Sequence, residues 1–234
     1  AHELAGCSKK GIKISNDLIN AAKHSEAFID FSSIESTLHA SEISAQARIV
    51  HVIGTTGFSI EQEEIIKAAA RHATVIKSGN MSLGINILLG VVQNITKLVD
   101  DNWAIEISEI HHKEKKDHPS GTALALGASV AKGKKIDLEE NKVIDDPIID
   151  AGDINLTKIR KNVVRKKDDI GFSSYRKDGV IGDHSVIFSS ENERIALTHI
   201  AKNRDIFANG ALKAALWGQN KKPGLYSMQD VLGF

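Results

Sequence analysis

Residues 109–127 combine two histidines, several lysines and a Pro-Ser-Gly-Thr turn, and this combination suits proton transfer beside a bound anion. The adjacent pair His111 and His112 is followed within four residues by three lysines: Lys113, Lys115 and Lys116. Histidine changes its charge near neutral pH, and lysine can hold a carboxylate or donate a proton when its pKa is lowered. A metal site, a proton relay and an anion clamp are all compatible with this run taken alone.

The two histidines are poorly arranged to share a metal ion. They follow a strand predicted at residues 104–107, where Ile105 and Ile107 alternate inward. Adjacent residues on a strand point to opposite faces, and the His-Glu-x-x-His spacing of a helical zinc site is absent. We therefore predict no metal ligands here, and proton transfer becomes the better interpretation.

A helix is predicted to begin directly after the turn formed by residues 119–122. Its first turn offers unpaired N–H groups and the positive end of the helix dipole, which together suit a carboxylate or a phosphate. Gly121 has no side chain, so a ligand can approach the backbone there. For most of the lysines a solvated loop is a sufficient interpretation, and only one of them needs a functional role.

Two glycine-containing segments, residues 54–57 (GTTG) and 78–82 (SGNMS), follow predicted strands. A third segment, Phe31-Ser32, ends another strand. In an open parallel sheet, ligands bind outside the carboxyl ends of the strands, so the three segments are expected to meet at one crevice. Each alone could be an ordinary turn, but their convergence favours a cofactor site.

The elements that position these segments are strands at 27–31, 49–53 and 74–76, separated by helices. The first helix is expected at residues 35–47, and the second opens at Ser59, with Gln62 completing a capping box. Its buried stripe is predicted to be Ile65, Ile66, Ala69 and Ala70. Strands alternating with helices predict a doubly wound parallel sheet, which we assign to residues 1–82 and 204–234.

Residues 83–203 are predicted to form a second domain of the α+β class with an open mixed sheet. A long apolar helix is expected at Leu83–Val99. The strands that follow it look antiparallel, with turns at 177–179 and 191–193; they are predicted at 104–107, 171–175, 180–188 and 194–200. The chain then closes with a helix at 209–217, a Pro223-Gly224 turn and a small helical piece.

The composition of the 234 residues excludes a general attraction to nucleic acid or to an anionic membrane, since 30 basic and 30 acidic side chains cancel. The single cysteine, Cys7, has no internal disulfide partner, so a reducing cytoplasm is expected. Six basic residues crowd positions 158–167. A solvated surface is the simpler interpretation of that run, and a phosphate-binding patch is the alternative.

Four motifs together resemble the dihydrodipicolinate reductase family, also called 4-hydroxy-tetrahydrodipicolinate reductases, of bacterial lysine and diaminopimelate synthesis. The most specific is His-His-x-x-Lys-x-Asp-x-Pro-Ser-Gly-Thr-Ala at His111–Ala123. Three others agree in order and spacing: VIGTTGF at 52–58, NMSLGIN at 80–86 and FANGA at 207–211. The resemblance implies a cytoplasmic homotetramer, built through the sheet of the second domain, that passes a hydride from NADPH or NADH to a cyclic, unsaturated dicarboxylate.

The resemblance also implies roles for individual residues. His111 corresponds to the acid/base residue and Lys115 to the proton donor. Substrate binding is expected from four residues: His112, Ser120, Gly121 and Thr122. Cofactor binding is expected from Phe31 and from residues of three further segments: Gly54, Thr55, Thr56, Ser78, Gly79, Asn80, Met81, Arg204 and Phe207.

Members of this family begin with a strand and a Gly-rich phosphate loop that this sequence does not contain. Preceding residues outside the sequence, a truncation and a paralogue without cofactor binding all explain the difference, and we expect the first. The main alternative function is a non-catalytic dicarboxylate-binding or assembly protein. A related imine-reducing amino-acid dehydrogenase remains open only if the substrate carboxylates are recognised elsewhere.

Overall fold

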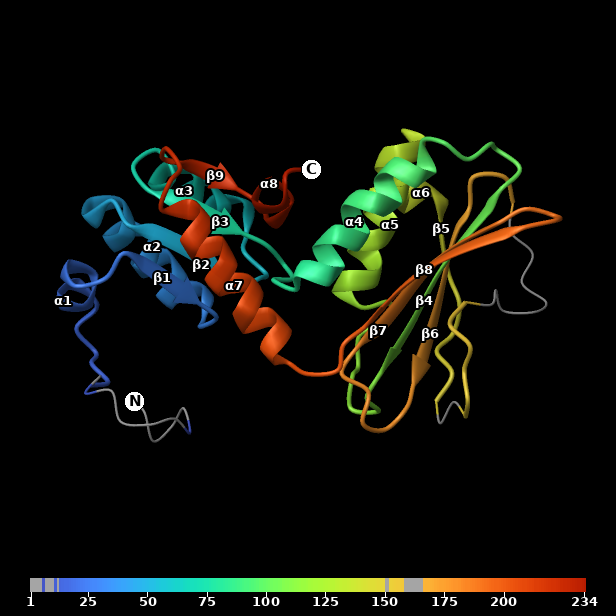
Figure 1. Ribbon diagram of the computed structural model, residues 1–234, viewed down its shortest axis with the longest axis horizontal. Coiled ribbons are helices and arrows are strands. Elements are labelled where there is room, and N and C mark those ends of the chain that lie inside the picture. Colours follow the sequence, from blue (N-terminus) through green and yellow to red (C-terminus); the bar gives the residue numbers. More distant parts are fainter. Residues whose placement is uncertain (1–5, 7–10, 12, 150–151, 158–165) are drawn as a thin grey trace. The chain divides into compact units, whose positions relative to one another are not determined.

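The computed structural model describes Gly6, Gly11 and residues 13–149, 152–157 and 166–234 (Figure 1). The chain divides into two compact units. Unit 1 comprises Ala1–Ser78 and Ala211–Ser227, and unit 2 comprises Gly79–Gly210 and Met228–Phe234. Among the described residues, no helix combines the length and the apolar character that crossing a membrane requires.

Unit 1 is a parallel sheet with the strand order β1-β2-β3-β9. Its strands are β1 (Ala27–Asp30), β2 (Val50–Ile53), β3 (Thr74–Lys77) and β9 (Gly224–Tyr226). Its helices are α1 (Leu18–Lys23), α2 (Ile34–Ala47), α3 (Ile60–Ala69) and most of α7 (Asp205–Gly218). The expected parallel sheet is therefore confirmed.

Helices cover both faces of this sheet, as a doubly wound fold requires. Ile66 of α3 packs with Ile53 and Val75 on one face. On the other face α7 approaches so closely that a Cβ at Gly218 would lie 2.8 Å from a Val50 methyl group and 2.9 Å from Ile76 Cδ1. The arrangement follows from period-2 alternation, which sends neighbouring β-branched residues of one strand to opposite faces.

The predicted capping box at the start of α3 is present. The Ser59 hydroxyl accepts from the Gln62 N–H, and the Gln62 side chain accepts from the Ser59 N–H. One residue of the predicted stripe is wrong, because Ile65 is 41% exposed. Ile66 faces the sheet, and Ile65, the residue before it, is turned by about 100° around the helix axis.

Strand β9 was not predicted. It was interpreted as a turn after Pro223, yet it pairs in parallel with β3, Leu225 opposite Val75. Its three residues are too few to show a period, so only the edge of β3 reveals its place. Helix α7 also begins earlier than predicted, at Asp205 rather than residue 209.

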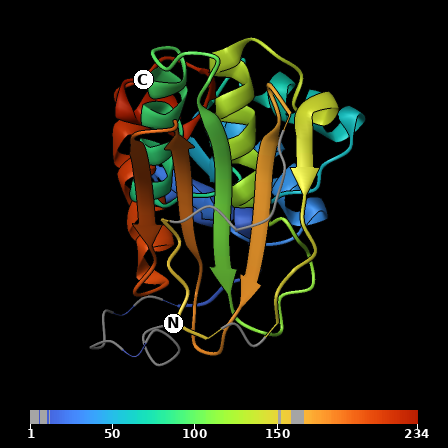
Figure 2. The same cartoon turned by 90° about the vertical axis from the view of Figure 1, so that its right-hand side faces the viewer.

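Unit 2 contains a five-stranded mixed sheet with the order β5-β6-β4-β7-β8 (Figure 2). Its strands are β4 (Ala104–His111), β5 (Lys142–Ile144), β6 (Ile170–Arg176), β7 (Asp183–Ser189) and β8 (Arg194–Ile200). Its helices are α4 (Leu83–Thr96), α5 (Gly121–Lys134), α6 (Leu138–Asn141) and α8 (Met228–Leu232). The predicted open mixed sheet is confirmed.

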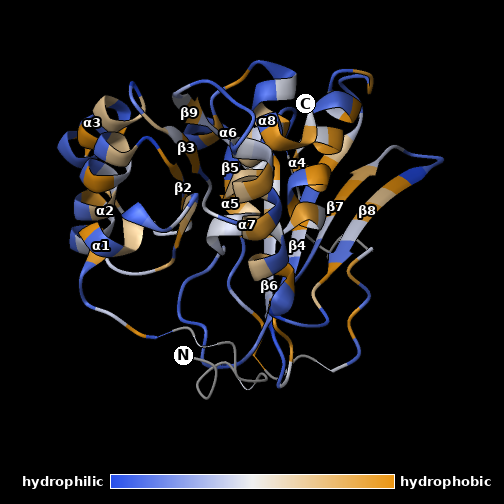
Figure 3. Cartoon of the chain, turned by 60° about the vertical axis from the view of Figure 1, so that its left-hand side comes forward, coloured by the Kyte–Doolittle hydropathy of each residue, from blue (hydrophilic) through white to orange (hydrophobic). Residues whose placement is uncertain are grey.

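Helices α4 and α5 pack on one face of that sheet and form its core with alternate strand residues. Val92 of α4 and Leu126 of α5 are fully buried with Ile107, Phe172 and Val186. Figure 3 shows the apolar colour running along α4, β7 and β8. Gly127 permits this packing, because a Cβ there would lie 2.4 Å from the Phe172 ring.

Three expectations for unit 2 are wrong. Strand β6 runs parallel to β4 rather than antiparallel, since α5 lies between them in the chain and carries it back across the sheet. Strand β4 continues to His111 instead of ending at Ile107. Helix α4 ends at Thr96, where i→i+3 bonds tighten the chain, and Leu98 is 82% exposed.

Elements α1, α6 and β5 were not predicted either, because each is shorter than two helical turns or four strand residues. The basic run at 158–167 lies mostly outside the described residues. Of its members Lys166 and Lys167 are described, and Lys167 pairs with Asp101 at 2.8 Å. Both interpretations of that run remain untested.

Candidate active site

Three neighbouring strands of unit 2 bring a group of buried polar side chains to the start of α5. Glu109 and His111 lie two apart on β4 and therefore share a face. Strands β6 and β7 flank β4 and add Arg176 and His184 on that face. Glu109 and Arg176 are each 1% exposed, His184 3% and His111 8%.

The Glu109 carboxylate is the centre of this group. Its Oε1 accepts from the Ser120 N–H at 3.0 Å and from the Ser174 hydroxyl at 2.8 Å. Its Oε2 lies 3.4 Å from His111 Nδ1 and 3.6 Å from His184 Nε2. A guanidinium nitrogen of Arg176 lies 3.9 Å from Oε1 and supplies the balancing positive charge.

Both histidines are held in the neutral form. Burial, and then the positive charge of Lys115, lowers the pKa of His111 to about 4. Burial also lowers the pKa of His184 to about 3. Their rings meet edge to face with centroids 5.0 Å apart. At neutral pH the group therefore offers imidazole rather than imidazolium.

Ser120 connects the first turn of α5 to this group. Its hydroxyl accepts from the Ala123 N–H at 3.1 Å as the N-cap and lies 3.1 Å from His184 Nε2. Gly121 is exposed, and a Cβ there would meet nothing within 4 Å. Among the predicted substrate ligands, the Ser120 side chain is thus turned inward, whereas Gly121 faces open space.

The loop after β4 carries the predicted proton donor, and Arg176 holds that loop. Its guanidinium donates to the Lys115 carbonyl at 3.0 Å, to the Asp117 carbonyl at 2.8 Å and to the Tyr175 carbonyl at 2.9 Å. The Lys115 ammonium in turn bonds both carboxylate oxygens of Asp117 at 2.8 Å. The hydrogen bond from Lys115 lowers the pKa of Asp117.

Glu109, His111 and His184 also form a group compact enough to hold a metal ion, with one ligand atom of each within 4.8 Å of the others. The sequence led us to consider only His111 with His112, which is partly exposed and not a member of this group. A cation here would lie beside the Arg176 guanidinium. Because Arg176 already balances Glu109, we interpret the group as a proton-holding network.

The predicted cofactor segments of unit 1 meet at the carboxyl ends of its strands. The Gly54 N–H donates to the Asp30 carbonyl at 2.8 Å, and the Ser78 N–H to the Ile53 carbonyl at 3.2 Å. The Phe31 ring lies against Gly54, where a Cβ would be only 2.2 Å from it. Thr55 bonds Thr37 of α2 at 3.0 Å, and Thr56 is exposed.

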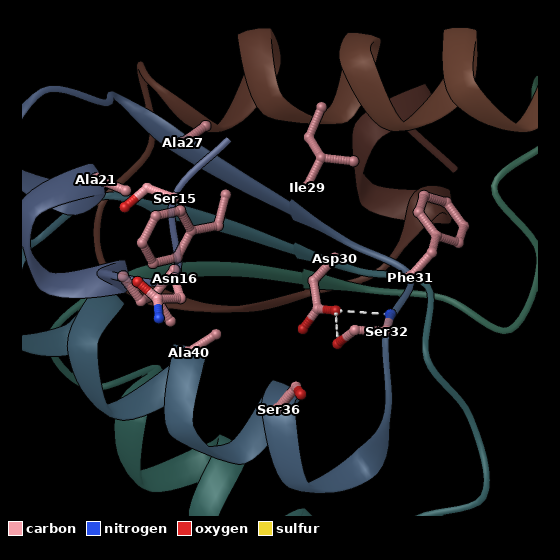
Figure 4. A pocket seen from close by; sticks show the side chains of 12 residues that line it. Ser15, Asn16, Ala21, Ala27, Ile29, Asp30, Phe31, Ser32, Ser36 and Ala40 are labelled. Atoms are coloured by element: carbon pink, nitrogen blue, oxygen red, sulfur yellow. Dashed lines mark hydrogen bonds between the residues drawn. The ribbon is translucent and has the colours of Figure 1, made fainter. Parts of the chain in front are cut away.

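A hollow of about 560 Å³ borders β1 and the start of α2 (Figure 4). Asp30 and Phe31 both line it, and their side chains point to opposite sides of the chain. Asp30 accepts from the Ser32 N–H and hydroxyl. Burial alone would raise the pKa of Asp30, but hydrogen bonds from His51 and Ser32 outweigh it and hold that pKa well below its ordinary value. Asp30 is therefore a carboxylate at neutral pH.

The remaining predicted cofactor residues belong to unit 2. Asn80 donates to the Thr122 hydroxyl at 3.1 Å, which ties the NMS segment to the first turn of α5. Gly210 allows α7 to approach that segment, since a Cβ there would lie 1.7 Å from the Met81 carbonyl oxygen. Arg204 is exposed just before α7, and Phe207 lies partly exposed in its first turn. Gly79 follows Ser78 at the boundary of the units.

Sequence reasoning missed Glu109, Arg176 and His184. Each carries a polar group in a strand that otherwise sends apolar side chains inward, for example Ile105 and Ile107 before Glu109. A charged residue in phase with the buried side of a strand is an available signal, because such a residue needs a partner. The identity of the partners depends on the strand order and could not be deduced.

Models of one protein family match both parts of the chain. The family described as dihydrodipicolinate reductase, N-terminus, matches residues 1–81, and that described as dihydrodipicolinate reductase, C-terminus, matches residues 84–232. A 4-hydroxy-tetrahydrodipicolinate reductase of Parvibaculum lavamentivorans is 51% identical over 98% of this chain and 81% of its own length. The corresponding protein of Rhizobium rhizogenes is 48% identical over 100% of this chain and 81% of its own.

Solved structures show the same fold. A dipicolinate-bound dihydrodipicolinate reductase from Paenisporosarcina sp. TG-14 superimposes with a TM-score of 0.71 at 20% identity, covering 93% of this chain and 77% of that one. An amine dehydrogenase from Mycobacterium smegmatis gives 0.60 at 9% identity, covering 97% and 83%. At such identities the likeness concerns the fold alone.

Proposed function

Since this chain belongs to the dihydrodipicolinate reductase family, we propose that it reduces 4-hydroxy-tetrahydrodipicolinate to tetrahydrodipicolinate with NADPH or NADH. The 4-hydroxyl group leaves as water, and a hydride and a proton are added to the ring. The nicotinamide supplies the hydride, and the protein must bind two carboxylates and deliver the proton. Lysine and diaminopimelate synthesis is the setting of this step.

The observation that carries the proposal is the proximity of His111, Lys115 and the first turn of α5 in unit 2. Lys115 lies close enough to His111 for its charge to lower the imidazole pKa. Asn80 links Thr122 of that turn to a predicted cofactor segment. Cationic and N–H donors are thereby gathered beside an imidazole, as a dicarboxylate undergoing proton transfer requires.

We assign the proton-carrying role to Lys115 and the acid/base role to His111. Substrate carboxylates would draw the Lys115 ammonium away from Asp117, its partner in the free protein. Two negative charges near His111 would also raise its pKa from about 4. Hydride addition to the conjugated imine builds negative charge, which a proton from this pair neutralises.

The dinucleotide is assigned to the carboxyl edge of the sheet in unit 1. Gly54 and Phe31 would face its nicotinamide half, because the exposed Phe31 ring packs directly against Gly54 and offers an aromatic face there. The segment Ser78–Met81, which follows β3, is assigned to the same cofactor site on the resemblance. Arg204 and Phe207 keep their predicted cofactor roles on the resemblance alone.

A homotetramer is the proposed assembly, joined through the sheet of unit 2. Its support is the sheet's exposed apolar side chains near both edges: Ile144 is 42% exposed on β5, and Ile200 58% on β8. Light scattering from the purified protein should give four times the chain mass. A monomer at micromolar concentration would contradict this assembly. The cytoplasmic location stays a prediction.

The decisive experiment is NADPH and NADH oxidation by the protein, supplied with freshly formed condensation product of pyruvate and aspartate semialdehyde. Rapid oxidation is expected, and the ratio of the two rates gives the cofactor preference. His111→Gln and Lys115→Ala should each reduce kcat by about 10²-fold or more. The matched control is Lys113→Ala, in the same loop, whose ammonium pairs with exposed Asp178.

A folded wild-type protein that oxidises neither cofactor would favour the alternative, a dicarboxylate-binding protein. Calorimetry with dipicolinate then distinguishes the two outcomes. Dipicolinate binding by such an inactive protein would support the binder, whereas absence of binding would contradict both functions.

A further inference from the structure

Glu109 has no part in the roles proposed above, although it is a buried carboxylate at the centre of the polar group on β4, β6 and β7. It is 1% exposed, and its two carboxylate oxygens differ in their hydrogen bonds. Oε1 accepts two hydrogen bonds, whereas Oε2 has no hydrogen-bond partner among the described residues. A buried carboxylate oxygen without a donor is costly, so a nearby proton should satisfy it.

The nearest titratable nitrogen to that oxygen belongs to His111. Nδ1 of His111 lies 3.4 Å from Oε2 and is itself without a partner among the described residues. A carboxylate only accepts hydrogen bonds, and a neutral imidazole carries its one proton on either nitrogen. A proton on Nδ1 would serve both buried atoms, and a shortening of the 3.4 Å separation on ligand binding would form the hydrogen bond.

The opposite nitrogen of His111, Nε2, lies beside Gly182, which has no side chain. A Cβ at Gly182 would lie 2.9 Å from His111 Nε2 and 3.2 Å from its Cδ2. The same Cβ would lie 3.6 Å from Cε1 of His184. Gly182 thus packs beside Nε2 without a side chain that would displace the imidazole, and His184 lies next to it.

We propose that Glu109 is a positioning residue that keeps His111 in the Nδ1–H tautomer, so that Nε2 exchanges the proton with the substrate. The first half of the proposal, the Nδ1–H tautomer, concerns the free protein. The second half, proton exchange between Nε2 and the substrate, rests on the proposed reductase function. Two residues fix the Glu109 carboxylate. The positive charge of Arg176 lies beside it, and the Ser174 hydroxyl donates a hydrogen bond to its Oε1.

The tautomer can be measured without any activity. In protein labelled with ¹⁵N-histidine, two-bond ¹H–¹⁵N correlation at pH 7 reports which ring nitrogen carries the proton, and His111→Gln identifies the signal. The wild type should show protonated Nδ1. Glu109→Gln presents an amide that can donate to Nδ1, and it should move the proton to Nε2.

The control is Glu106→Gln, the same substitution three residues earlier on β4. Glu106 is also 1% exposed, but it accepts from Ser173 on the opposite face of the sheet. Its variant should keep the wild-type tautomer of His111. A wild-type signal with protonated Nε2 overturns the proposal, and this result does not depend on whether Glu109→Gln folds.

Steady-state kinetics test the second half. Glu109→Gln should lower kcat by about 10²- to 10⁴-fold, as an inverted tautomer does in other carboxylate–histidine pairs, with KM changed less than about threefold. Unchanged kcat together with an inverted tautomer would overturn the assignment of Nε2. A wild type with protonated Nδ1 that oxidises no cofactor would reject the reductase function and leave the role of Glu109 standing.

Discussion

At the scale of single residues, the candidate site consists of polar side chains that are buried together. Each of them affects the protonation or the hydrogen bonding of its neighbours. Burial lowers the pKa of His111 to about 4, and the positive charge of Lys115 acts in the same direction. Glu109 accepts from Ser120 and Ser174 and faces both histidines. His111, the proposed acid/base residue, is therefore neutral at pH 7 before any ligand binds.

Gly182 provides a test of the orientation of the His111 ring. Gly182→Ala would place a methyl group 2.9 Å from His111 Nε2, so the imidazole ring must move. We expect kcat to fall by about tenfold or more, because a shift of about 1 Å in a reacting group has effects of that order or larger. The melting temperature should change little, since the ring can turn without displacing the backbone.

The control for this variant is Gly152→Ala, where a Cβ would meet nothing within 4 Å. It should leave both kcat and the melting temperature as they are. Wild-type kcat in Gly182→Ala would show that the space beside Nε2 is not used.

At the scale of elements, the candidate site depends on the order of the strands and on one side chain, Arg176, which extends from β6 to the loop after β4. Parallel pairing of β4 with β6 places Arg176 opposite His111 at the ends of the two strands. From there its guanidinium bonds the carbonyls of Lys115 and Asp117 in the loop that follows β4. A loop without regular structure thus obtains a fixed conformation from a neighbouring strand.

Arg176→Lys should loosen this loop while it preserves the charge beside Glu109. An ammonium group lacks the planar fork that reaches three carbonyl oxygens at once. We expect kcat/KM to fall by about 10- to 100-fold. Brief trypsin digestion followed by mass spectrometry should show faster cleavage after Lys113, Lys115 or Lys116.

The control is Arg194→Lys, at an exposed arginine that bonds the Thr157 carbonyl at 3.3 Å. It should match the wild type in rate and in cleavage pattern. If Arg176→Lys is also cleaved at the wild-type rate, the loop is held by other contacts.

At the scale of the whole molecule, buried titratable groups in both units make stability depend on pH. In unit 1 the buried Asp30 carboxylate lies 3.3 Å from His51, which in turn lies 3.3 Å from the Ser41 hydroxyl. In unit 2 His111 and His184 are held neutral, and burial lowers the pKa of His199 as well. Asp30 and these three histidines bind protons differently in the folded and unfolded chains.

The free energy of unfolding should fall as the pH is lowered from 6.5 to 4.5. Below about pH 6.5 the unfolded chain protonates its histidines, whereas folded His111 and His184 stay neutral down to about pH 4 and about pH 3. Each such histidine contributes up to about 1.4 kcal/mol per pH unit in this window, the limit for a group that binds one proton in the unfolded chain and none in the folded one. Asp30 acts at lower pH, because its stabilisation is lost only below the ordinary pKa of a carboxyl group.

Urea unfolding at several pH values, followed by the fluorescence of Trp103 and Trp217, measures this slope. His184→Gln removes one of the titrating groups, so its slope between pH 6.5 and 4.5 should be smaller than that of the wild type. Equal slopes in the two proteins would mean that folded His184 is protonated in this window.

The sequence by itself determined the features that depend on local patterns. The capping box at Ser59, the parallel β-α-β order of unit 1 and the helix after Ser120 all follow from residue spacing. The His111–Ala123 motif was specific enough to indicate the family, which the comparisons confirmed. These features depend on residues that are close together in the chain, so they can be predicted from the sequence alone.

Only the tertiary structure decided which distant residues complete the site. Glu109 is near His111 in the chain, but Arg176 and His184 arrive on strands β6 and β7, whose places beside β4 no local pattern reveals. Strand β9 likewise exists because β3 offers it an edge. Strand order and direction result from packing the whole sheet against α4 and α5. The free energy of this packing comes from contacts among residues far apart in the sequence.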